Sequence, residues 1–376
     1  MRKRLYIMIA AMVALFFTAA CVSTPSTAVP TTAAVPSPKP AAIDTSPVTI
    51  RYGEITGVPS PTLIVVEGQG FLAKENITLE KYGFNGAGPV ADALAAGNLD
   101  MGTTSPVPAM LASAKGAKTI LIAGFEDAFV EKNGQAWEPL FVVVRSGEGI
   151  QKLTDLKGKK VAVTDIGSYS NYALRASMID SKIDPDKDMV IVPVPSTQMP
   201  AALMQKQVDV IVCSADSYVQ VQTMGKVDAI ANDTSLVGLD LDVSTTLAVN
   251  TDYLQAKPDV AVRFLRAFIQ ARQWMAADIV KNKGQNIIDL IAKAMKYTPE
   301  KATALYNTRG GYYGRELDLI NLLDIPVRSV NRYYEILRIN AFIKPEIPSD
   351  YAKVVDIRPL EQAYATMGLV WDAGKH

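Results

Sequence analysis

The chain has 376 residues, 49% of them hydrophobic and 20% charged, and its 38 basic and 38 acidic side chains balance. Because the basic residues do not outnumber the acidic ones, a strongly positive surface is not expected and nucleic-acid binding is not predicted. The only histidine is His376, and the only cysteines are Cys21 and Cys213. This composition argues against a histidine-based metal site and a Ser-His-Asp triad, so we predict neither a metal nor a cofactor.

The N-terminus has the pattern of an export signal. Basic residues 2–4 precede an apolar run over 5–17, and the small residues 18–20 precede Cys21. The apolar run is shorter than the ~20 residues that a membrane-spanning helix needs. Cysteine after small residues resembles the bacterial lipobox, although Thr18 stands where Leu is commoner. We predict a lipoprotein signal peptide over residues 1–20 and lipidation of Cys21; an ordinary signal peptide with an incidental cysteine is the alternative.

A spacer follows the predicted lipidation site. Residues 22–47 are almost all Ser, Thr, Ala, Val and Pro, a composition that cannot bury a core. At about 3.1 Å per residue, an extended spacer of this kind reaches up to about 80 Å. We therefore predict that residues 21–47 tether the rest of the chain to a membrane. Beyond Cys21 only Cys213 remains, so no intrachain disulfide is expected.

From residue 48 onward, short apolar runs alternate with helical patterns, which is typical of βαβ units on parallel sheets. A first series predicts strands at 50–53, 77–82, 99–102, 119–123 and 140–144, with helices at 61–71 and from Pro89 to just before Gly97. A second series predicts strands at 160–164, 189–194 and 208–213, with helices at 153–156, from 165–168 onward and at 200–205. A strand at 245–250 is expected to return toward the first series. An amphipathic stripe through Phe264 and Phe268 indicates a helical C-terminal part.

One short pattern occurs twice. Ala93-Leu94 stands five and six residues before Leu99-Asp100, and Ala202-Leu203 stands at the same distances from Val208-Asp209. In both copies an apolar strand follows the aspartate and ends in a loop that contains Ser or Thr. The repeated unit predicts two similar α/β halves, with chance similarity as the alternative.

Several segments in this order resemble one family. They are EGQGFL at 67–72, ADALAAGNLDMG at 91–102, AKGA at 114–117 and LTDLKGKKVAV at 153–163. Together they are similar to the nitrate, sulfonate and taurine class of ABC-importer substrate-binding proteins, which includes thiamine-precursor and riboflavin binders. The likeness covers roughly residues 48–275.

The resemblance implies an α/β, two-lobed periplasmic-binding-protein fold of type II. It implies two crossing strands, expected near Phe141–Arg145 and Thr246–Asn250, and a ligand in the interlobe cleft. We assign residues 48–143 and 247–376 to lobe one and 144–246 to lobe two. The implied protein is a monomer, lipid-anchored on the extracytoplasmic face of the cell membrane, that delivers a small molecule to an ABC permease and its ATPase.

Candidate ligand-binding residues lie in loops that follow strands, beside helix N-termini. In open α/β sheets, ligands bind beyond the carboxyl ends of strands, where backbone N–H groups favour an anion or a polar carbonyl. The predicted ligand-binding residues are Glu54, Thr56, Gly86, Gly88, Thr104, Ser105, Phe125, Ser168, Tyr169, Ser196 and Asp216.

Several of these residues also have structural interpretations. Gly86 and Gly88 can serve only a tight turn, Ser168 and Ser196 can simply cap helices, and Asp216 can be a solvated loop acid. Trp137, Tyr172 and Tyr218, like Phe125 and Tyr169, can wall an aromatic ligand or belong to the core. Cys213 is expected to be a small buried hydrophobe.

Glu54 leads to a hypothesis about the ligand. A carboxylate in a desolvated cleft is costly unless something pairs with it. A cation or N–H donor on the ligand is therefore expected to face Glu54. The helix N-termini beside the candidate loops instead favour a sulfonate, nitrate or carboxylate, so the ligand's identity stays open.

Two other function classes are considered. One is an enzyme of the pyrimidine-synthase type on the same fold, which depends on histidine- and cysteine-rich chemistry that this chain lacks. The other is a ligand-sensing module for a membrane partner. We predict that the protein is not an enzyme.

Overall fold

The structure is a computed structural model, and it describes residues 43–57, 60–130, 136–137, 140–232, 235–236, 238, 241–308, 325, 327–345 and 349–371. Cys21 lies outside this part with its predicted leader and with the predicted spacer up to residue 42, as does His376, and Trp137 is described by its backbone only. The described end of the predicted spacer is not free, because Arg263 donates to the Ser46 carbonyl at 2.9 Å. None of the helices in the described part combines the length and the apolar character that a membrane-spanning helix requires.

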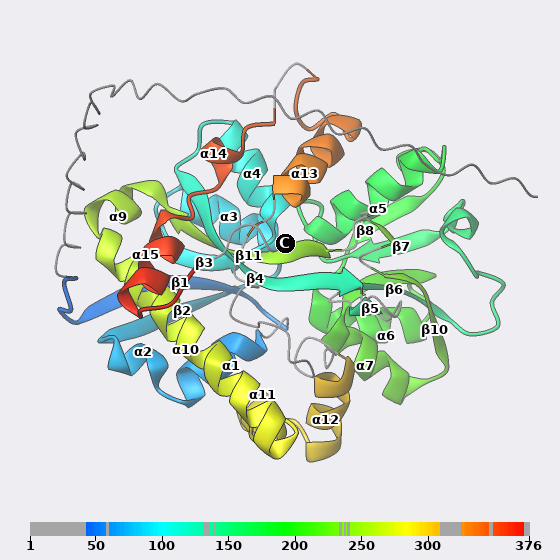
Figure 1. Cartoon of the computed structure of the whole chain (residues 1–376). Coiled ribbons are helices and arrows are strands. Elements are labelled where there is room, and N and C mark those ends of the chain that lie inside the picture. Colours follow the sequence, from blue (N-terminus) through cyan, green and yellow to red (C-terminus); the bar gives the residue numbers. More distant parts are fainter. Residues whose placement is uncertain are drawn as a thin grey trace, which may run out of the picture. The chain divides into compact units, whose positions relative to one another are not determined.

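The first sheet has six strands in the order β2-β1-β3-β11-β4-β5 (Figure 1). Strand β1 is parallel to β2 and β3, whereas β11 is antiparallel to β3 and β4, and β5 is antiparallel to β4. The bounds are β1 Val48–Ile55, β2 Ile77–Phe84, β3 Met101–Thr104, β4 Thr119–Val130, β5 Ala136–Trp137 and β11 Leu241–Asn250.

The second sheet has five strands in the order β10-β6-β9-β7-β8. Strand β7 is parallel to β8 and β9, and β6 is antiparallel to β9 and β10. The bounds are β6 Leu140–Arg145, β7 Lys160–Val163, β8 Val190–Pro193, β9 Val210–Ser214 and β10 Val227–Asn232. We call the first sheet with its helices lobe one and the second sheet with its helices lobe two.

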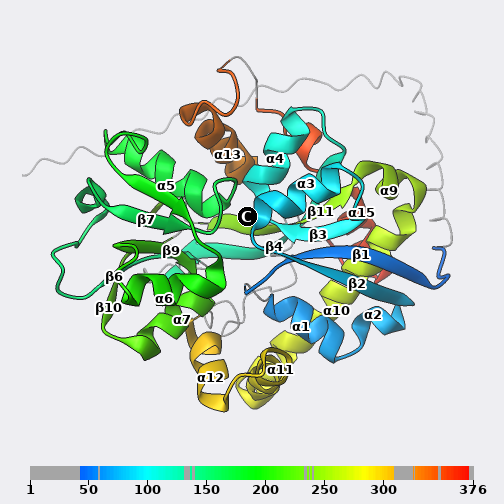
Figure 2. The same cartoon turned by 180° about the vertical axis from the view of Figure 1, so that it is seen from behind.

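Helices cover both faces of the second sheet, with α5 on one side and α6 and α7 on the other (Figures 1 and 2). The helices up to the return strand are α1 Pro61–Gly68, α2 Phe71–Lys74, α3 Ala87–Ala95, α4 Pro106–Ala114, η1 Leu153–Leu156, α5 Tyr169–Asp180, η2 Ser196–Gln198, α6 Met199–Met204 and α7 Ala215–Met224. The helices after it are α9 Thr251–Ala256, α10 Pro258–Asn282, α11 Gln285–Met295, α12 Pro299–Thr308, α13 Val327–Ile339, α14 Tyr351–Val354 and α15 Arg358–Thr366.

The sequence pattern that occurs twice forms the same local structure in both lobes. In lobe one, Arg51 N–H donates to Asp100 Oδ2 at 2.8 Å, and Asp100 N–H donates to the Arg51 carbonyl at 2.9 Å. In lobe two, Lys160 and Asp209 make the same two bonds at the same two distances. The two pairs are offset by 109 positions, and so are the two Ala-Leu pairs. Each lobe therefore has the same junction between its first and third parallel strands.

The predicted crossing segments are wrong. Among the described strands, Leu140–Arg145 pairs with β9 and β10 inside the second sheet, and Thr246–Asn250 lies inside the first sheet. The chain instead passes to the second sheet between Trp137 and Leu140 and returns between Asn232 and Leu241. The long strands β4 and β11, which pair with each other from Thr119 to Phe129, lead to these two passages.

The core lies in three layers. One cluster joins the first sheet to α1, α10 and α11, and another joins the second sheet to α6 and α7. The third is continuous across both lobes, because α3, α4, α5 and α13 all contribute to it. The C-terminal helices do not all lie on lobe one: α12 packs against α7, and α13 packs against both α4 and α5.

Candidate functional site

The candidate site is the junction at which loops from the two lobes meet. In lobe one these loops follow β1 and precede α3, and in lobe two they follow β7 and precede α6. Each lies at the carboxyl end of a parallel strand, where an α/β sheet presents helix N-termini. The Ser60 and Ser168 side chains cap α1 and α5 by accepting from backbone N–H groups, which fixes where both helices begin.

The two lobes touch each other through equivalent loops. A Cβ on Gly57, in the loop after β1, would lie 2.6 Å from Thr197 Cγ2 of η2. A Cβ on Gly86, before α3, would lie 1.8 Å from Asp165 Oδ2, in the loop after β7. At the 109-residue offset, the loop after β1 matches the loop after β7, and the start of α3 matches η2. The junction therefore consists of two reciprocal contacts of one kind.

Glycine is required at Gly86 by space rather than by its backbone angles. Its φ of −177° is extended, a conformation that any residue adopts. The Asp165 carboxylate occupies the space that a Cβ would take, so a side chain here would require Asp165 to move. Gly88 and Gly167 meet beside it, since a Cβ on either would lie 3.5 Å from the Cα of the other. These glycines thus serve the contact between the lobes.

Asp165 is the charged group at the centre of this contact. Its Oδ2 is buried and has no hydrogen-bond partner among the described residues. Burial raises the pKa of Asp165 to about 6; the backbone N–H groups of Gly167 and Ala87 oppose this shift, and the carboxylate of Asp92 adds to it. Tyr172, whose pKa is raised to about 12 chiefly by burial, is a second group affected by this carboxylate. In the sequence Asp165 lies in a loop that opens a helix, and no pattern there marks it as a ligand-binding residue.

Glu54 lies beside a small cavity at the edge of the junction. The cavity measures about 250 Å³ and is lined by residues of β1, α1 and α11, together with Thr56, Gly57 and Lys81. Lys81 Nζ lies 3.5 Å from Glu54 and 3.1 Å from Glu67. Burial lowers the pKa of Lys81, but Glu67 and Glu54 outweigh it and raise the pKa overall. Glu54 therefore already has a cation partner, so the reason for expecting one from the ligand does not apply to it.

Thr104 is the last residue of β3 and Ser105 follows it, and the two lie beside the starts of α3 and α4. Thr104 is fully buried, and its Oγ1 donates to the Ala87 carbonyl at 2.9 Å. Ser105 is the N-cap of α4, without a side-chain cap bond. Thr104 thus braces the helix turn that faces Asp165, and Ser105 lies one residue further along the same loop.

A serine cluster lies on the lobe-two side of the junction. Ser196 Oγ lies 3.1 Å from Ser217 Oγ and 3.5 Å from Ser214 Oγ, and all three residues are buried. Ser217 Oγ also donates to the Ser196 carbonyl at 3.0 Å. The cluster joins η2 to the N-terminus of α7, so Ser196 holds the element that carries Thr197.

The remaining predicted residues are buried. Ser168 donates to the Asp165 carbonyl at 2.7 Å as well as capping α5, so it shapes the Asp165 loop. Tyr169 packs edge-to-face against Tyr333 of α13. Phe125 packs against Phe268 in the lobe-one core.

Asp216 is buried in the first turn of α7 and accepts from Tyr297 Oη at 3.2 Å. The interpretation of Asp216 as a solvated loop acid is therefore wrong. Cys213 is fully buried, which raises the pKa of its thiol, as expected of a small buried hydrophobe.

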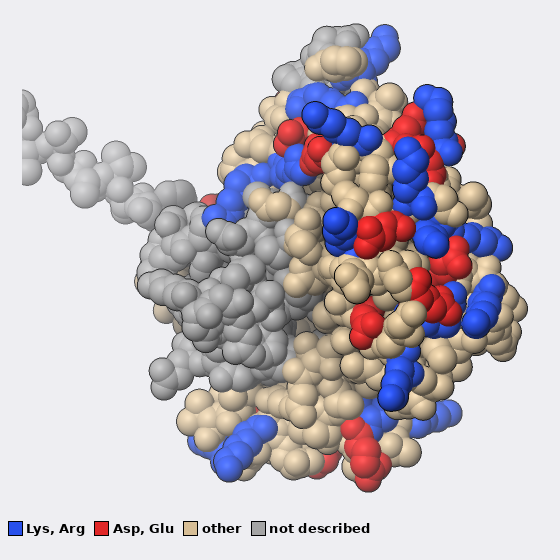
Figure 3. Space-filling view, turned by 90° about the vertical axis from the view of Figure 1, so that its right-hand side faces the viewer, with Lys and Arg blue, Asp and Glu red and all other residues tan. Residues whose placement is uncertain are grey.

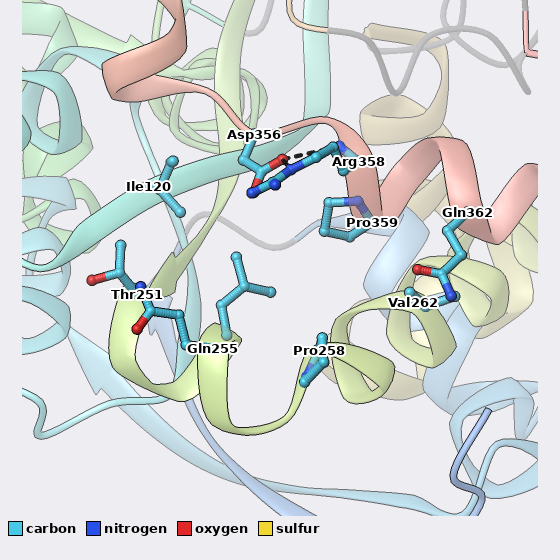
Figure 4. A pocket seen from close by; sticks show the side chains of 10 residues that line it. Ile120, Thr251, Gln255, Pro258, Val262, Asp356, Arg358, Pro359 and Gln362 are labelled. Carbon is cyan, nitrogen blue, oxygen red and sulfur yellow. Dashed lines mark hydrogen bonds and ion pairs between the residues drawn. The ribbon is translucent and has the colours of Figure 1, made fainter. Parts of the chain in front are cut away.

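A second cavity lies away from the junction, beside α9, α10 and α15 (Figure 4). It measures about 430 Å³, and its described lining residues all belong to lobe one. Arg358 donates to both oxygens of Asp356, at 2.7 and 2.6 Å, which lowers the pKa of Asp356. Because these two charges neutralise each other, the cavity offers a ligand little charge to recognise.

The two α/β lobes, their strand order and their loop-to-loop junction define a periplasmic-binding-protein fold. Within that fold the chain belongs to the NMT1-like family, whose sequence profile matches residues 41–292. No curated protein sequence matches the chain.

Solved structures share the fold at low sequence identity. The alkanesulfonate-binding protein SsuA of Xanthomonas axonopodis pv. citri, bound to MOPS, is 19% identical, with 72% of this chain and 86% of that chain covered and a TM-score of 0.58. The periplasmic nitrate-binding protein NrtA of Synechocystis PCC 6803 is 15% identical, with 85% and 89% covered and a TM-score of 0.66. A cysteine-to-serine mutant of DSZB, in complex with biphenyl-2-sulfinic acid, is 15% identical, with 85% and 99% covered and a TM-score of 0.58.

Proposed function

We propose that this protein is an extracytoplasmic solute-binding protein that delivers a small molecule to an ABC permease and its ATPase. The observation that carries the proposal is the pair of reciprocal loop contacts, Gly57 with Thr197 and Gly86 with Asp165. The fold's relatives include proteins named for binding alkanesulfonates and nitrate, which supports the same class of function.

The proposed mechanism uses closure of the two lobes. Between the strands of the two sheets that the structure describes, the chain passes twice, so a hinge motion between the sheets needs few backbone changes there. A ligand held by the loops after β1 and β7 and by the starts of α3 and η2 contacts both lobes. It therefore stabilises the closed form, which the permease can distinguish from the open one.

The protein is further proposed to be anchored by a lipid on Cys21. The positive leader, the small residues before Cys21 and the Ser/Thr/Pro-rich spacer support this proposal. The Cys21→Ser variant should be released from the membrane fraction while its ligand affinity stays unchanged. An N-terminal peptide of the wild-type protein without an acyl group would contradict the lipid anchor but not the solute-binding function.

The test of the binding function starts from the protein's own host. Native mass spectrometry of the purified protein should reveal a bound small molecule, and deletion of the gene should abolish its uptake. Small-angle scattering should give a smaller radius of gyration with this molecule than without it. Normal uptake in the deletion strain would reject the import function.

An enzyme on this fold is the second candidate, favoured by the structural likeness to DSZB. Cys213 does not suit a nucleophile, because a reactive cysteine needs access and a lowered pKa, whereas this thiol is buried and its pKa is raised. Conversion of the co-purified molecule during incubation, followed by mass spectrometry, would support this alternative.

On the face in Figure 3, basic and acidic side chains are interspersed over the described surface. This distribution, together with the equal numbers of the two charges in the chain, supports a partner other than nucleic acid.

A further inference from the structure

We infer that Asp165 is a specificity-determining residue that rejects an oxyanion beside the start of α3 and selects a ligand presenting a cation or an N–H donor there. The inference rests on the proposed solute-binding function and names the chemical class of its ligand. Asp165 then has the role that the sequence suggests for Glu54, namely to face a cation or N–H donor of the ligand.

The position of Asp165 supports this inference. Asp165 extends from lobe two to the first residues of α3, so close to Gly86 that a Cβ there would lie 1.8 Å from Oδ2. The start of a helix attracts anions through its free N–H groups. Asp165 places the chain's own carboxylate where a ligand's anionic group would otherwise be expected.

The charged groups around Asp165 also support the inference. No Lys or Arg side chain of the described residues pairs with Asp165, and its buried Oδ2 has no hydrogen-bond partner among them. The charged side chain that does act on it, Asp92, is another acid. An oxyanion from a ligand would add further negative charge to a site that already lacks a cation. A ligand cation or N–H donor would supply the missing partner.

The equivalent loop of lobe one shows that the fold does not need an acid at the position of Asp165. At the 109-residue offset, the residue of lobe one equivalent to Asp165 is Thr56. The loop after β1 therefore leads into its helix with a neutral residue. Glu54 supplies no matching charge, because Lys81 already lies 3.5 Å from it. Asp165 is thus the unpaired acid that distinguishes one side of the junction from the other.

The experiment measures binding of sulfate and nitrate to the full mature chain by isothermal titration calorimetry at pH 7.5. Asp165→Asn should bind at least one of these anions at least about tenfold more tightly than the wild type does, since it removes the repulsion but keeps the shape. Asp228→Asn is the matched control, because it removes an exposed acid of β10 that is not among the groups acting on Asp165, and it should behave as the wild type.

Asp165→Thr, which copies the residue of lobe one, provides a second variant if the Asn variant does not fold. Equal binding of these anions by the wild type and the variants overturns the inference, and so does absence of binding by all of them.

A second arm separates this inference from the proposed function. The molecule that co-purifies with the wild type should carry an amine, amidine or heterocyclic N–H, and its Kd should rise at least about tenfold in Asp165→Asn. If the gene supports uptake of a purely oxyanionic molecule, the function stands and the inference fails. If the variants gain anion binding but deletion leaves uptake unchanged, the inference stands and the function fails.

Discussion

Replacing Asp165 by Asn should stabilise the folded protein at neutral pH, because the wild-type carboxylate is ionised in a poorly solvated place. Its pKa is raised from the ordinary 3.8 to about 6 in the folded state. A raised pKa means that the folded state holds the proton more tightly than the unfolded state does. The stability from this group is therefore fully present below pH 3.8 and is lost as the pH rises through about 6.

The magnitude follows from the size of this shift. About two pKa units at about 1.4 kcal/mol each set an upper limit of about 3 kcal/mol above pH 6. Asp165 is only partly buried, and Asn also changes the interaction with the Ala87 and Gly167 amides, so solvent screening reduces the expected gain to about 1–2 kcal/mol. At pH 4, where most of the wild-type carboxyl is protonated, the gain should nearly vanish.

Urea unfolding at pH 4 and pH 7.5 measures this difference, with Asp228→Asn, an exposed acid of β10, as the control for a lost exposed charge. The free energy of unfolding of Asp165→Asn should exceed that of the wild type at pH 7.5 only. An equal difference at both pH values, or a less stable variant at pH 7.5, would refute the electrostatic argument.

Three further outcomes are expected. Gly86→Ala should push the lobes apart where its Cβ meets Asp165 Oδ2, and should raise hydrogen exchange at residues 165–168; the double variant with Asp165→Gly should return toward wild-type exchange. Thr104→Val should lower the free energy of unfolding by about 1–2 kcal/mol in urea, because the buried bond to the Ala87 carbonyl is lost; an unchanged midpoint would contradict this role. Cys213 should not react with a thiol reagent in the native protein and should react once the protein is unfolded; rapid native reaction would mean that its strand opens.

The strand and helix series could be predicted from the sequence because apolar periodicity and glycine positions determine both. The crossing points could not. Strand β4 continues through Glu126 and Asp127, where the apolar run used for the prediction has already ended. Its full length depends on pairing with β11, which lies more than 100 residues away in the chain.

The site was predictable as a set of loops but not as a set of contacts. Asp165, before Ile166 and Gly167, has the pattern of an ordinary turn. Its role depends on its contact with Gly86, which lies far from it in the sequence. Asp216 and Phe125 depend in the same way on the distant residues Tyr297 and Phe268, and Tyr297 lies beyond the family likeness.

The repeated junction between Arg51 and Asp100, and between Lys160 and Asp209, bears on how the protein tells one end of a ligand from the other. Two halves on the same plan present nearly the same backbone to a molecule held between them, so the backbone alone favours either orientation equally. Orientation must then come from positions at which the halves differ. Thr56 and Asp165 are such a pair, one neutral and one acidic. An asymmetric molecule would enter with its cationic or N–H end toward lobe two, and a symmetric dication would have two equivalent ways to bind.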